Sequence, residues 1–343
     1  MIPTIAPEYT IFELGSGFED TPEWGASFIA CPWYIYLWYG DDSAIRKHYV
    51  AMKRYINYLA SRAEGWIVDY GLGDWFDIGP ERPGKAQLTT VALSATAMFY
   101  YDLTIMQKIA AHLGQKADEQ VFAQKAAKVK EAFNSRFYKG GEKVYENGSQ
   151  AGLAMALYMG LVTEETKQPA LDALVRDIEE RGFAFTPGDI GFRYLIQALQ
   201  ENGRGDVIYR LNCNPEIPSY AYQLSKGATA LTESWQAYDN VSNNHLMLGH
   251  LMEWLYGGLG GITQGEGAAW EHIVIAPQMV GDISWAKTSL DTVKGKVSCH
   301  WTRDLQGTSW TMDVIIPEGA DAKVILPDGN VAEVGPGTHH FED

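Results

Sequence analysis

Apolar residues recur at helical spacing along most of the chain up to Gly258. Apolar positions three and four residues apart predict amphipathic helices, and the runs end at glycines such as Gly114 and Gly182, where a positive φ angle terminates a helix. Ten helices are predicted, at residues 24–39, 42–63, 87–113, 116–137, 149–159, 163–181, 188–202, 203–212, 218–225 and 243–258. Long and short helices joined by such turns indicate stacked helical hairpins and a mainly α domain.

The pattern changes to β-branched residues and turns after Gly261. Short segments such as "HIVIAPQ" and "DAKVILPDG" are typical of strands that end in turns. They predict a small β-sandwich from about residue 265. With 343 residues, the chain is long enough for a large core and an accessory domain. We therefore divide it into a helical domain at 1–262 and a C-terminal β-sandwich domain at 263–343.

The net charge argues against several kinds of partner. The chain has 27 basic and 43 acidic side chains, and a charge of −16 repels nucleic acids and anionic lipid surfaces. The most apolar stretch, which starts at Ala26, is shorter than a membrane span needs and contains Pro32, so it is predicted to be a core helix. The N-terminus lacks a signal-peptide pattern, and the sequence does not decide between cytoplasm and periplasm.

The cysteines and the known motifs indicate no cofactor or metal. Cys31, Cys213 and Cys299 are scattered and lack the paired spacing of a zinc or dithiol site. Each is predicted to be a small buried hydrophobic residue. The motifs of a nucleophilic serine, a phosphate-binding loop, a zinc protease and a dinucleotide site are all missing from the sequence.

Carboxylates lie beside tryptophans at three places in the sequence: Glu23-Trp24, Asp74-Trp75 and Glu233-Ser234-Trp235. Flat amphipathic rings pack well against sugar faces. Cleavage of a glycosidic acetal needs one carboxyl group as acid and another as base. These residues therefore indicate a glycoside hydrolase, with the long Gly- and Pro-rich loop at 68–87 as a favourable place for part of the site.

Structural explanations compete for each of these residues. An acidic residue before a helix is commonly a cap, and a Gly-Asp pair is commonly a turn, which favours structural roles for Asp74, Asp77 and Asp189 taken singly. His245, which follows two asparagines, fits an ordinary capped helix start. Glu233 is the better candidate for function, because the small, uncharged run before it would leave a carboxylate poorly solvated.

Motifs spread over nearly the whole chain carry a family resemblance. They are "IAPEY" at 5–9, "PEWGASFIACPWYIYLWYGD" at 22–41, "GLGDWFDIGP" at 71–80, "LTTVALSATAMFYYD" at 88–102, "TPGDIGFRYLIQAL" at 186–199, "KGATALTESW" at 226–235, "NNHLMLGHLMEWLY" at 243–256, "IVIAPQ" at 273–278 and "WAKTS" at 285–289. Together they resemble the bacterial α-L-rhamnosidases of glycoside hydrolase family 78. The resemblance implies an (α/α)6 barrel followed by a β-domain, which hydrolyses terminal α-L-rhamnosides with inversion and without a cofactor.

The resemblance also implies roles for individual residues. By matching position, Glu233 resembles the general base that activates water, and His245 resembles a residue that bonds a sugar hydroxyl. Trp24 and Trp75 resemble aromatic walls around the rhamnose. The remaining candidates for sugar contacts share the Trp75 loop or adjoin the base: Asp74, Asp77 and Trp235.

The family's general-acid motif, D-E-R-x-G-W-x-G-D, has no counterpart in this sequence. We therefore expect the chain to begin after that segment, to form a barrel without its first helices, and to have little rhamnosidase activity by itself. Exposed helix faces would then favour a homodimer. If the chain alone is active, one of Glu8, Glu23, Glu81 or Asp189 serves as the acid.

Two alternative functions are consistent with the same residues. A six-hairpin glycosidase acting on another sugar would share the scaffold and the carboxylate chemistry, because a fold does not determine its substrate. A carbohydrate-binding remnant would hold rhamnose without cleaving it. Turnover across a panel of nitrophenyl glycosides identifies the first alternative, and binding without turnover identifies the second.

Overall fold

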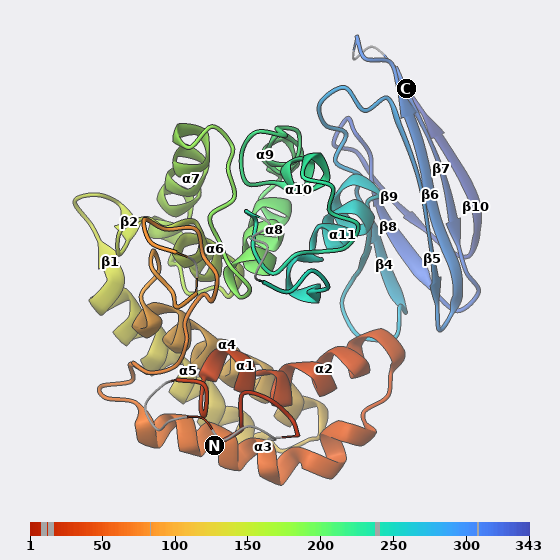
Figure 1. Ribbon diagram of the computed structural model, residues 1–343. Helices are drawn as coiled ribbons and strands as arrows, with labels where there is room; N and C mark the ends of the chain where they lie inside the picture. Colours follow the sequence, from red (N-terminus) through yellow and green to blue (C-terminus); the bar gives the residue numbers. More distant parts are fainter. Residues whose placement is uncertain (8–11, 13–16, 83, 237–240, 307–308) are drawn as a thin grey trace. The chain divides into compact units, whose positions relative to one another are not determined.

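The computed structural model describes residues 1–7, 12, 17–82, 84–236, 241–306 and 309–343 (Figure 1). The chain forms two compact units. The first comprises Met1–Trp33, Ser43–Ala198 and Leu211–Gly249, and the second comprises Tyr34–Asp42, Leu199–Arg210 and His250–Asp343.

The first unit is built mainly from α-helices, as the sequence predicts. Its helices are α1 (Pro22–Gly25), α3 (Ser43–Arg62), α4 (Val91–His112), α5 (Lys116–Phe137), α6 (Gln150–Tyr158), α7 (Glu164–Glu180) and α10 (Tyr220–Ser225). Two helices, α2 (Ser27–Tyr39) and α8 (Gly191–Glu201), extend into the second unit, to which most of α9 (Gly205–Leu211) belongs. From α3 to α10, the helix ends differ from the predicted ends by at most four residues.

Two predicted helices are interrupted. The run at 24–39 is divided into α1 and α2 at Ala26, and the run at 243–258 is divided into a 3-10 turn, η1 (Leu246–Leu248), a short helix, α11 (Leu251–Trp254), and a π turn, η2 (Leu255–Leu259). Glycines explain the second interruption, because glycine disfavours a regular helix and Gly249 ends η1. In the π turn, a Cβ atom on Gly258 would lie 2.2 Å from the Trp254 ring, so a larger residue does not fit.

Neighbouring helices of the first unit pack as hairpins. The helices α4 and α5 lie side by side, as do α6 and α7 (Figure 1). Most of α4 is buried, with Leu93 and Phe99 inaccessible to solvent. The turn glycines Gly114, Gly160 and Gly182 have positive φ angles, which confirms the predicted helix ends. A small hairpin of β1 (Tyr138–Lys139) and β2 (Val144–Tyr145), which the sequence analysis missed, connects α5 to α6.

The strands of the second unit form a β-sandwich. One sheet has the strand order β10-β7-β6-β5 and the other has the order β3-β4-β8-β9. The strands are β3 (Ile262–Gln264), β4 (His272–Ile275), β5 (Trp285–Thr292), β6 (Gly295–Arg303), β7 (Trp310–Ile316), β8 (Asp321–Ile325), β9 (Val331–Val334) and β10 (Gly337–Glu342). Side chains from both sheets, including Ile275, Trp301 and Val314, share one core. The β-rich C-terminal part is confirmed, and its first strand begins at Ile262 instead of near residue 265.

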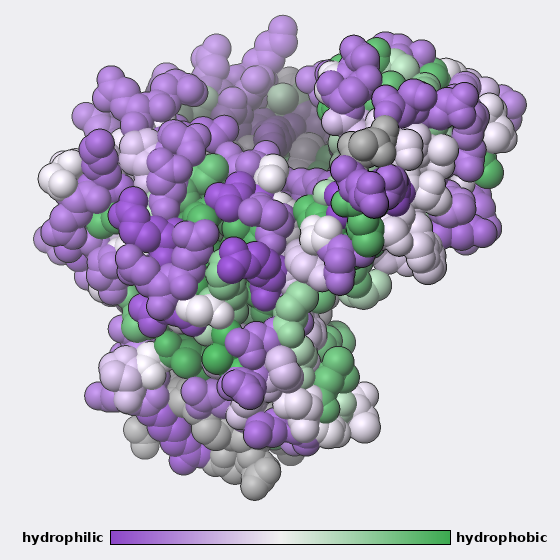
Figure 2. Space-filling view, turned by 90° about the horizontal axis from the view of Figure 1, so that it is seen from above, coloured by the Kyte–Doolittle hydropathy of each residue, from purple (hydrophilic) through white to green (hydrophobic). Residues whose placement is uncertain are grey.

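Two expectations from composition have different outcomes. Within the described residues, no helix is both long and apolar enough to cross a membrane, and hydrophilic side chains dominate the face drawn in Figure 2. The prediction that every cysteine is buried is wrong, because Cys31 and Cys213 are exposed and only Cys299 is buried. The prediction of a core helix in this stretch is also wrong, because Ile29 is the only buried residue of α2, the helix that contains Cys31. Its sequence is apolar on all sides, so its pattern does not identify a buried face.

One buried carboxylate in the helical unit has no hydrogen-bond partner. Asp102 on α4 is inaccessible to solvent, and neither of its oxygens has a partner among the described residues. Burial raises the pKa of this carboxyl well above its usual value. A group with a raised pKa in the folded state stabilises that state while it is protonated, and this contribution is lost as the pH rises through the folded-state pKa.

We therefore expect Asp102→Asn to raise the free energy of unfolding by about 1–3 kcal/mol at alkaline pH, because the substitution removes an unpaired buried charge. Chemical denaturation at about pH 5 and about pH 8 measures the difference. Asp118→Asn is the control, because the bond to Lys53, 2.6 Å long, lowers the pKa of Asp118 and its removal should not stabilise the protein. A lower stability of Asp102→Asn at the higher pH would contradict the prediction.

Candidate active site

The turn at residues 187–191, just before α8, is where most of the predicted site residues meet. The sequence Pro187-Gly188-Asp189-Ile190-Gly191 leads into α8, whose first residue is Gly191. Backbone and side-chain hydrogen bonds connect this turn to the loop at 68–87 and to the segment at 231–245. We refer to it below as the 187–191 turn.

Asp74 fixes the 187–191 turn through main-chain hydrogen bonds. One carboxylate oxygen accepts the N–H of Gly188 at 3.0 Å, and the other accepts those of Ile190 at 3.1 Å and Gly191 at 2.7 Å. These donors lie at the N-terminus of α8, where the helix dipole favours a negative charge. Burial, followed by the charge of Asp77, raises the pKa of Asp74 to about 7, and the N–H donors act in the opposite direction.

Asp77 fixes the loop at 68–87 in a similar way. Its carboxylate accepts the backbone N–H of Gln87 at 3.0 Å and that of Leu88 at 2.7 Å. Its side chain is buried, and burial raises its pKa. The oxygens of Asp74 and Asp77 thus accept backbone hydrogen bonds, which gives both residues a structural role. Their predicted sugar contacts stay predictions.

The two tryptophans next to the turn differ in exposure. The Trp75 carbonyl accepts the Asp189 N–H at 2.7 Å, and its half-buried ring meets Phe18 edge to face, with 5.1 Å between centroids. Trp235 is inaccessible to solvent, stacks on Phe185 at 4.6 Å, and donates its ring N–H to the Pro187 carbonyl at 2.8 Å. Trp75 therefore retains accessible surface, whereas Trp235 has no ring face left for a sugar.

Trp24 lies on α1 and is half-buried. Its neighbour Glu23 is buried and accepts hydrogen bonds from Thr21 at 2.8 Å and Ser94 at 2.6 Å. Burial raises the pKa of Glu23. The predicted wall role of Trp24 stays a prediction.

Gly188 is required by the close approach of the Trp75 loop. A Cβ atom at this position would lie 2.0 Å from the Trp75 carbonyl oxygen and 2.6 Å from the Asp77 nitrogen. Both atoms belong to the backbone, so neither moves aside easily. We expect Gly188→Ala to lower the free energy of unfolding by about 1–3 kcal/mol or more, as measured by urea denaturation. The control Gly141→Ala adds a methyl group where no atom lies within 4 Å and should have little effect; equal effects of the two variants would refute the packing argument.

Glu233 and His245 lie beside the turn. The Glu233 side chain is half-buried, and one of its oxygens accepts the Ser242 N–H at 3.0 Å, while the Glu233 N–H donates to the Ser242 carbonyl at 2.9 Å. His245 Nε2 lies 3.2 Å from a carboxylate oxygen of Asp189. Much of the run before Glu233 is exposed, so the prediction that this run leaves the carboxylate poorly solvated is wrong. Glu233 remains a candidate for function because Asp189 and His245 lie close to it.

The side chains of Asp189, Glu233 and His245 form the densest group of ionisable side chains at the site. One oxygen or nitrogen from each lies within 4.8 Å of the others. Burial raises the pKa of Asp189. The hydrogen bond to Asp189 raises the pKa of His245, and the charges of Asp189 and Glu233 add to this effect against partial burial.

The spacing of the group bears on the choice of acid. Inverting hydrolysis needs about 6.5–9.5 Å between acid and base, and Asp189 lies too close to Glu233 to be that acid. Glu23 is enclosed by hydrogen bonds, and Glu81 is exposed in its loop. Glu8 lies outside the described residues.

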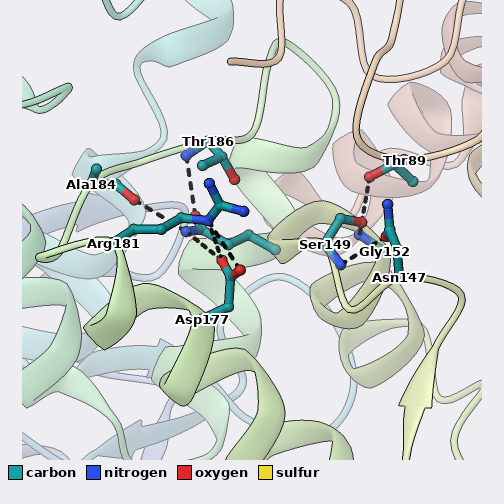
Figure 3. Close-up of polar contacts among 9 residues, drawn as sticks. Thr89, Asn147, Ser149, Gly152, Asp177, Arg181, Ala184 and Thr186 are labelled. Atoms are coloured by element: carbon teal, nitrogen blue, oxygen red, sulfur yellow. Dashed lines mark hydrogen bonds and ion pairs between the residues drawn. The ribbon is translucent and has the colours of Figure 1, made fainter. Parts of the chain in front are cut away.

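A small polar cavity of about 40 Å³ lies near the start of α6 and the end of α7, and it contains none of the predicted site residues. Asp177 accepts hydrogen bonds from Gln150 at 3.1 Å and Arg181 at 3.0 Å. Figure 3 shows Arg181 against Asp177, and Ser149 paired with the neighbouring Thr89. Because these polar groups satisfy one another, the network has a structural explanation.

Two family models match the chain in succession. The bacterial alpha-L-rhamnosidase 6 hairpin glycosidase domain matches residues 1–259, and the bacterial alpha-L-rhamnosidase C-terminal domain matches residues 261–341. An alpha-L-rhamnosidase of Formosa agariphila is 30% identical over 89% of this chain and 33% of its own length. One of Streptomyces avermitilis is 27% identical over 98% of this chain and 34% of its own length. The chain thus spans about a third of the length of these curated relatives.

Solved structures give the same result. An alpha-L-rhamnosidase from Dictyoglumus thermophilum has a TM-score of 0.87 and 30% identity, covering 95% of this chain and 40% of that chain. The Streptomyces avermitilis alpha-L-rhamnosidase complexed with L-rhamnose has a TM-score of 0.87 and 26% identity, covering 97% of this chain and 34% of that chain. These similarities confirm a six-hairpin glycosidase domain with a C-terminal β-domain.

Proposed function

Because this chain belongs to the bacterial α-L-rhamnosidase family, we propose that it provides the general base of an inverting glycosidase that removes terminal α-L-rhamnose from glycosides or oligosaccharides. The observation that carries the proposal is the group of Asp189, Glu233 and His245, whose polar atoms lie within 4.8 Å of one another; the Trp75 backbone carbonyl accepts the Asp189 N–H. We also propose that 1–262 forms the catalytic domain and 263–343 the accessory β-domain.

Glu233 is the residue we assign to water activation. The Ser242 N–H binds Oε2, which holds the carboxylate and leaves Oε1 for a water molecule. Glu233 takes a proton from that water as the oxygen attacks the anomeric carbon, and an acid on the other face of the sugar protonates the leaving oxygen. The product has the inverted configuration because water attacks opposite the leaving group.

We assign sugar binding to residues that have accessible surface near Glu233 or a matching family position. Trp75 and Trp24 offer ring faces to the apolar side of rhamnose, including its C6 methyl group, and His245 bonds a hydroxyl. Asp74, Asp77 and Trp235 instead hold the backbone on which these groups are mounted.

The proposal is tested with a panel of nitrophenyl glycosides, assayed with the chain and with any longer protein that contains it. From a longer protein that also supplies the general acid, we expect turnover of the α-L-rhamnoside and initial release of β-L-rhamnose, seen by NMR; from the chain alone we expect little turnover. Turnover by the chain alone would mean that the acid lies within residues 1–343. Preference for another sugar, or rhamnose binding without any turnover, would overturn the proposal in favour of the two alternative functions.

A further inference from the structure

We propose that Asp189 is a positioning residue for His245, which it holds by the Nε2 atom so that the ring presents Nδ1 to the sugar beside Glu233. The inference rests on the proposed function and adds to it a residue that does not itself touch the substrate. Three features of the structure support it: the rigidity of Asp189, the orientation of the imidazole, and the charges around the ring.

Asp189 is held more firmly than an ordinary turn residue. Its N–H donates to the Trp75 carbonyl at 2.7 Å, and the flanking N–H groups of Gly188 and Ile190 donate to Asp74. Its side chain is only 3% exposed. A carboxylate with a fixed backbone and little freedom can define the direction of a partner's side chain.

The pairing with His245 fixes one edge of the imidazole. Asp189 Oδ2 lies 3.2 Å from Nε2, and the backbone N–H of His245 donates to the Leu231 carbonyl at 2.9 Å. The His245 side chain is 25% exposed whereas that of Asp189 is 3% exposed, so the carboxylate lies on the buried side of the ring. A buried carboxylate behind an imidazole determines which ring nitrogen carries a proton and how the ring is turned.

The charges around the ring favour its protonated form. The acidic groups whose charges act on it are Asp189 from the 187–191 turn and Glu233 from its own segment, and the charge of Asp189 also acts on Asp74. The pKa of His245 is raised, chiefly by the bond to Asp189. In the imidazolium both nitrogens are donors, so Nδ1 can donate to a sugar hydroxyl oxygen. This donor is present below the folded-state pKa of His245 and is lost as the pH rises through it.

The other carboxylate oxygen of Asp189 bears on the importance of the bond to His245. Oδ1 is buried and has no hydrogen-bond partner among the described residues. A buried carboxylate with one unpaired oxygen is costly, and the imidazole of His245 is the side chain that pairs with the other oxygen. Replacing Asp189 by Asn keeps the size of the side chain but removes the charge, which makes it the informative variant.

The test is an NMR titration of the histidine ring nitrogens in the wild-type protein, Asp189→Asn and Asp189→Ala, with His245→Gln used to assign the His245 signals. We expect the His245 pKa to fall by about one unit or more in both Asp189 variants. Asp321→Asn is the matched control, because Asp321 pairs with His272 at 2.9 Å on the β-domain surface. It should lower the pKa of His272 and leave that of His245 unchanged.

The titration tests this inference independently of the proposed function, because the pKa of His245 can be measured without any enzymatic turnover. An unchanged His245 pKa in folded Asp189→Asn would overturn the inference even if the protein hydrolyses rhamnosides. If the variants do not fold, a wild-type His245 pKa at or below about 6.5 has the same result. In a protein that hydrolyses rhamnosides, Asp189→Asn should also shift the alkaline limb of kcat/KM to lower pH, which a purely structural residue would not do.

Discussion

Replacing Glu233 by Gln should reduce the turnover of α-L-rhamnosides by about a hundredfold or more. The amide has nearly the same shape as the carboxylate and can keep the contact with Ser242, whose N–H lies 3.0 Å from Oε2. It cannot take a proton from water, so the loss should appear in kcat with a smaller change in KM. The measurement is steady-state kinetics with a nitrophenyl α-L-rhamnoside, on a protein that contains this chain and is active.

Two controls distinguish a lost base from a damaged fold. Glu216→Gln changes an exposed glutamate and should retain near-normal kcat. Glu233→Ala should recover part of its activity when azide is added, because azide is already an anion and needs no base to activate it. Near-normal turnover in Glu233→Gln, or no rescue in a folded Glu233→Ala, would exclude Glu233 as the general base.

Trp235→Ala should cost about 3–5 kcal/mol of unfolding free energy. The side chain is inaccessible to solvent, and it packs against Phe185 and Phe192 with centroid distances of 4.6 Å and 4.8 Å. The substitution leaves a cavity and also removes the donor for the Pro187 carbonyl, which is 2.8 Å from the ring nitrogen. Urea denaturation followed by circular dichroism measures the loss.

Trp235→Phe separates packing from sugar contact. Phenylalanine retains most of the aromatic packing but lacks the ring N–H, so we expect a smaller loss of stability than in Trp235→Ala. Trp75→Phe changes a half-buried ring and should affect KM more than stability. A stable Trp235→Ala variant with a raised KM would restore the role of a sugar wall that the resemblance suggested.

The fold was largely predictable because the helices are long and their apolar spacing is regular. The helix at 116–137 coincides with α5, and Gly114 before it has the positive φ angle expected at a helix end. The segment at 243–258 was less predictable, because its apolar spacing is helical while its glycines permit a 3-10 turn and a π turn. The spacing of apolar residues does not reveal where a helix changes to a 3-10 turn or a π turn.

The site was only partly predictable, since its geometry depends on contacts between distant segments. Glu233 and Trp75 are candidates from their neighbours in the sequence and from the resemblance, and His245 is a candidate from the resemblance alone. The sequence predicts a turn at Asp189 and offers it as one of four candidate acids, but nothing in the local sequence reveals that its carboxylate meets His245, 56 positions later. The order of the motifs could have suggested it, because "TPGDIGF" is one of the segments that carry the resemblance.

The 187–191 turn should form later during refolding than the helices do. Asp74 and Gly191, which share a hydrogen bond, are 117 positions apart. The hairpins between them, α4 with α5 and α6 with α7, each join helices that follow one another in the sequence. Closing so long a loop has a large entropic cost, and local hairpins form sooner than distant contacts. Helical signal should therefore return before the Asp74 carboxylate reaches the start of α8. A population that looks refolded by circular dichroism can still lack a formed 187–191 turn, and recovery of catalysis is the later and stricter measure of the native state.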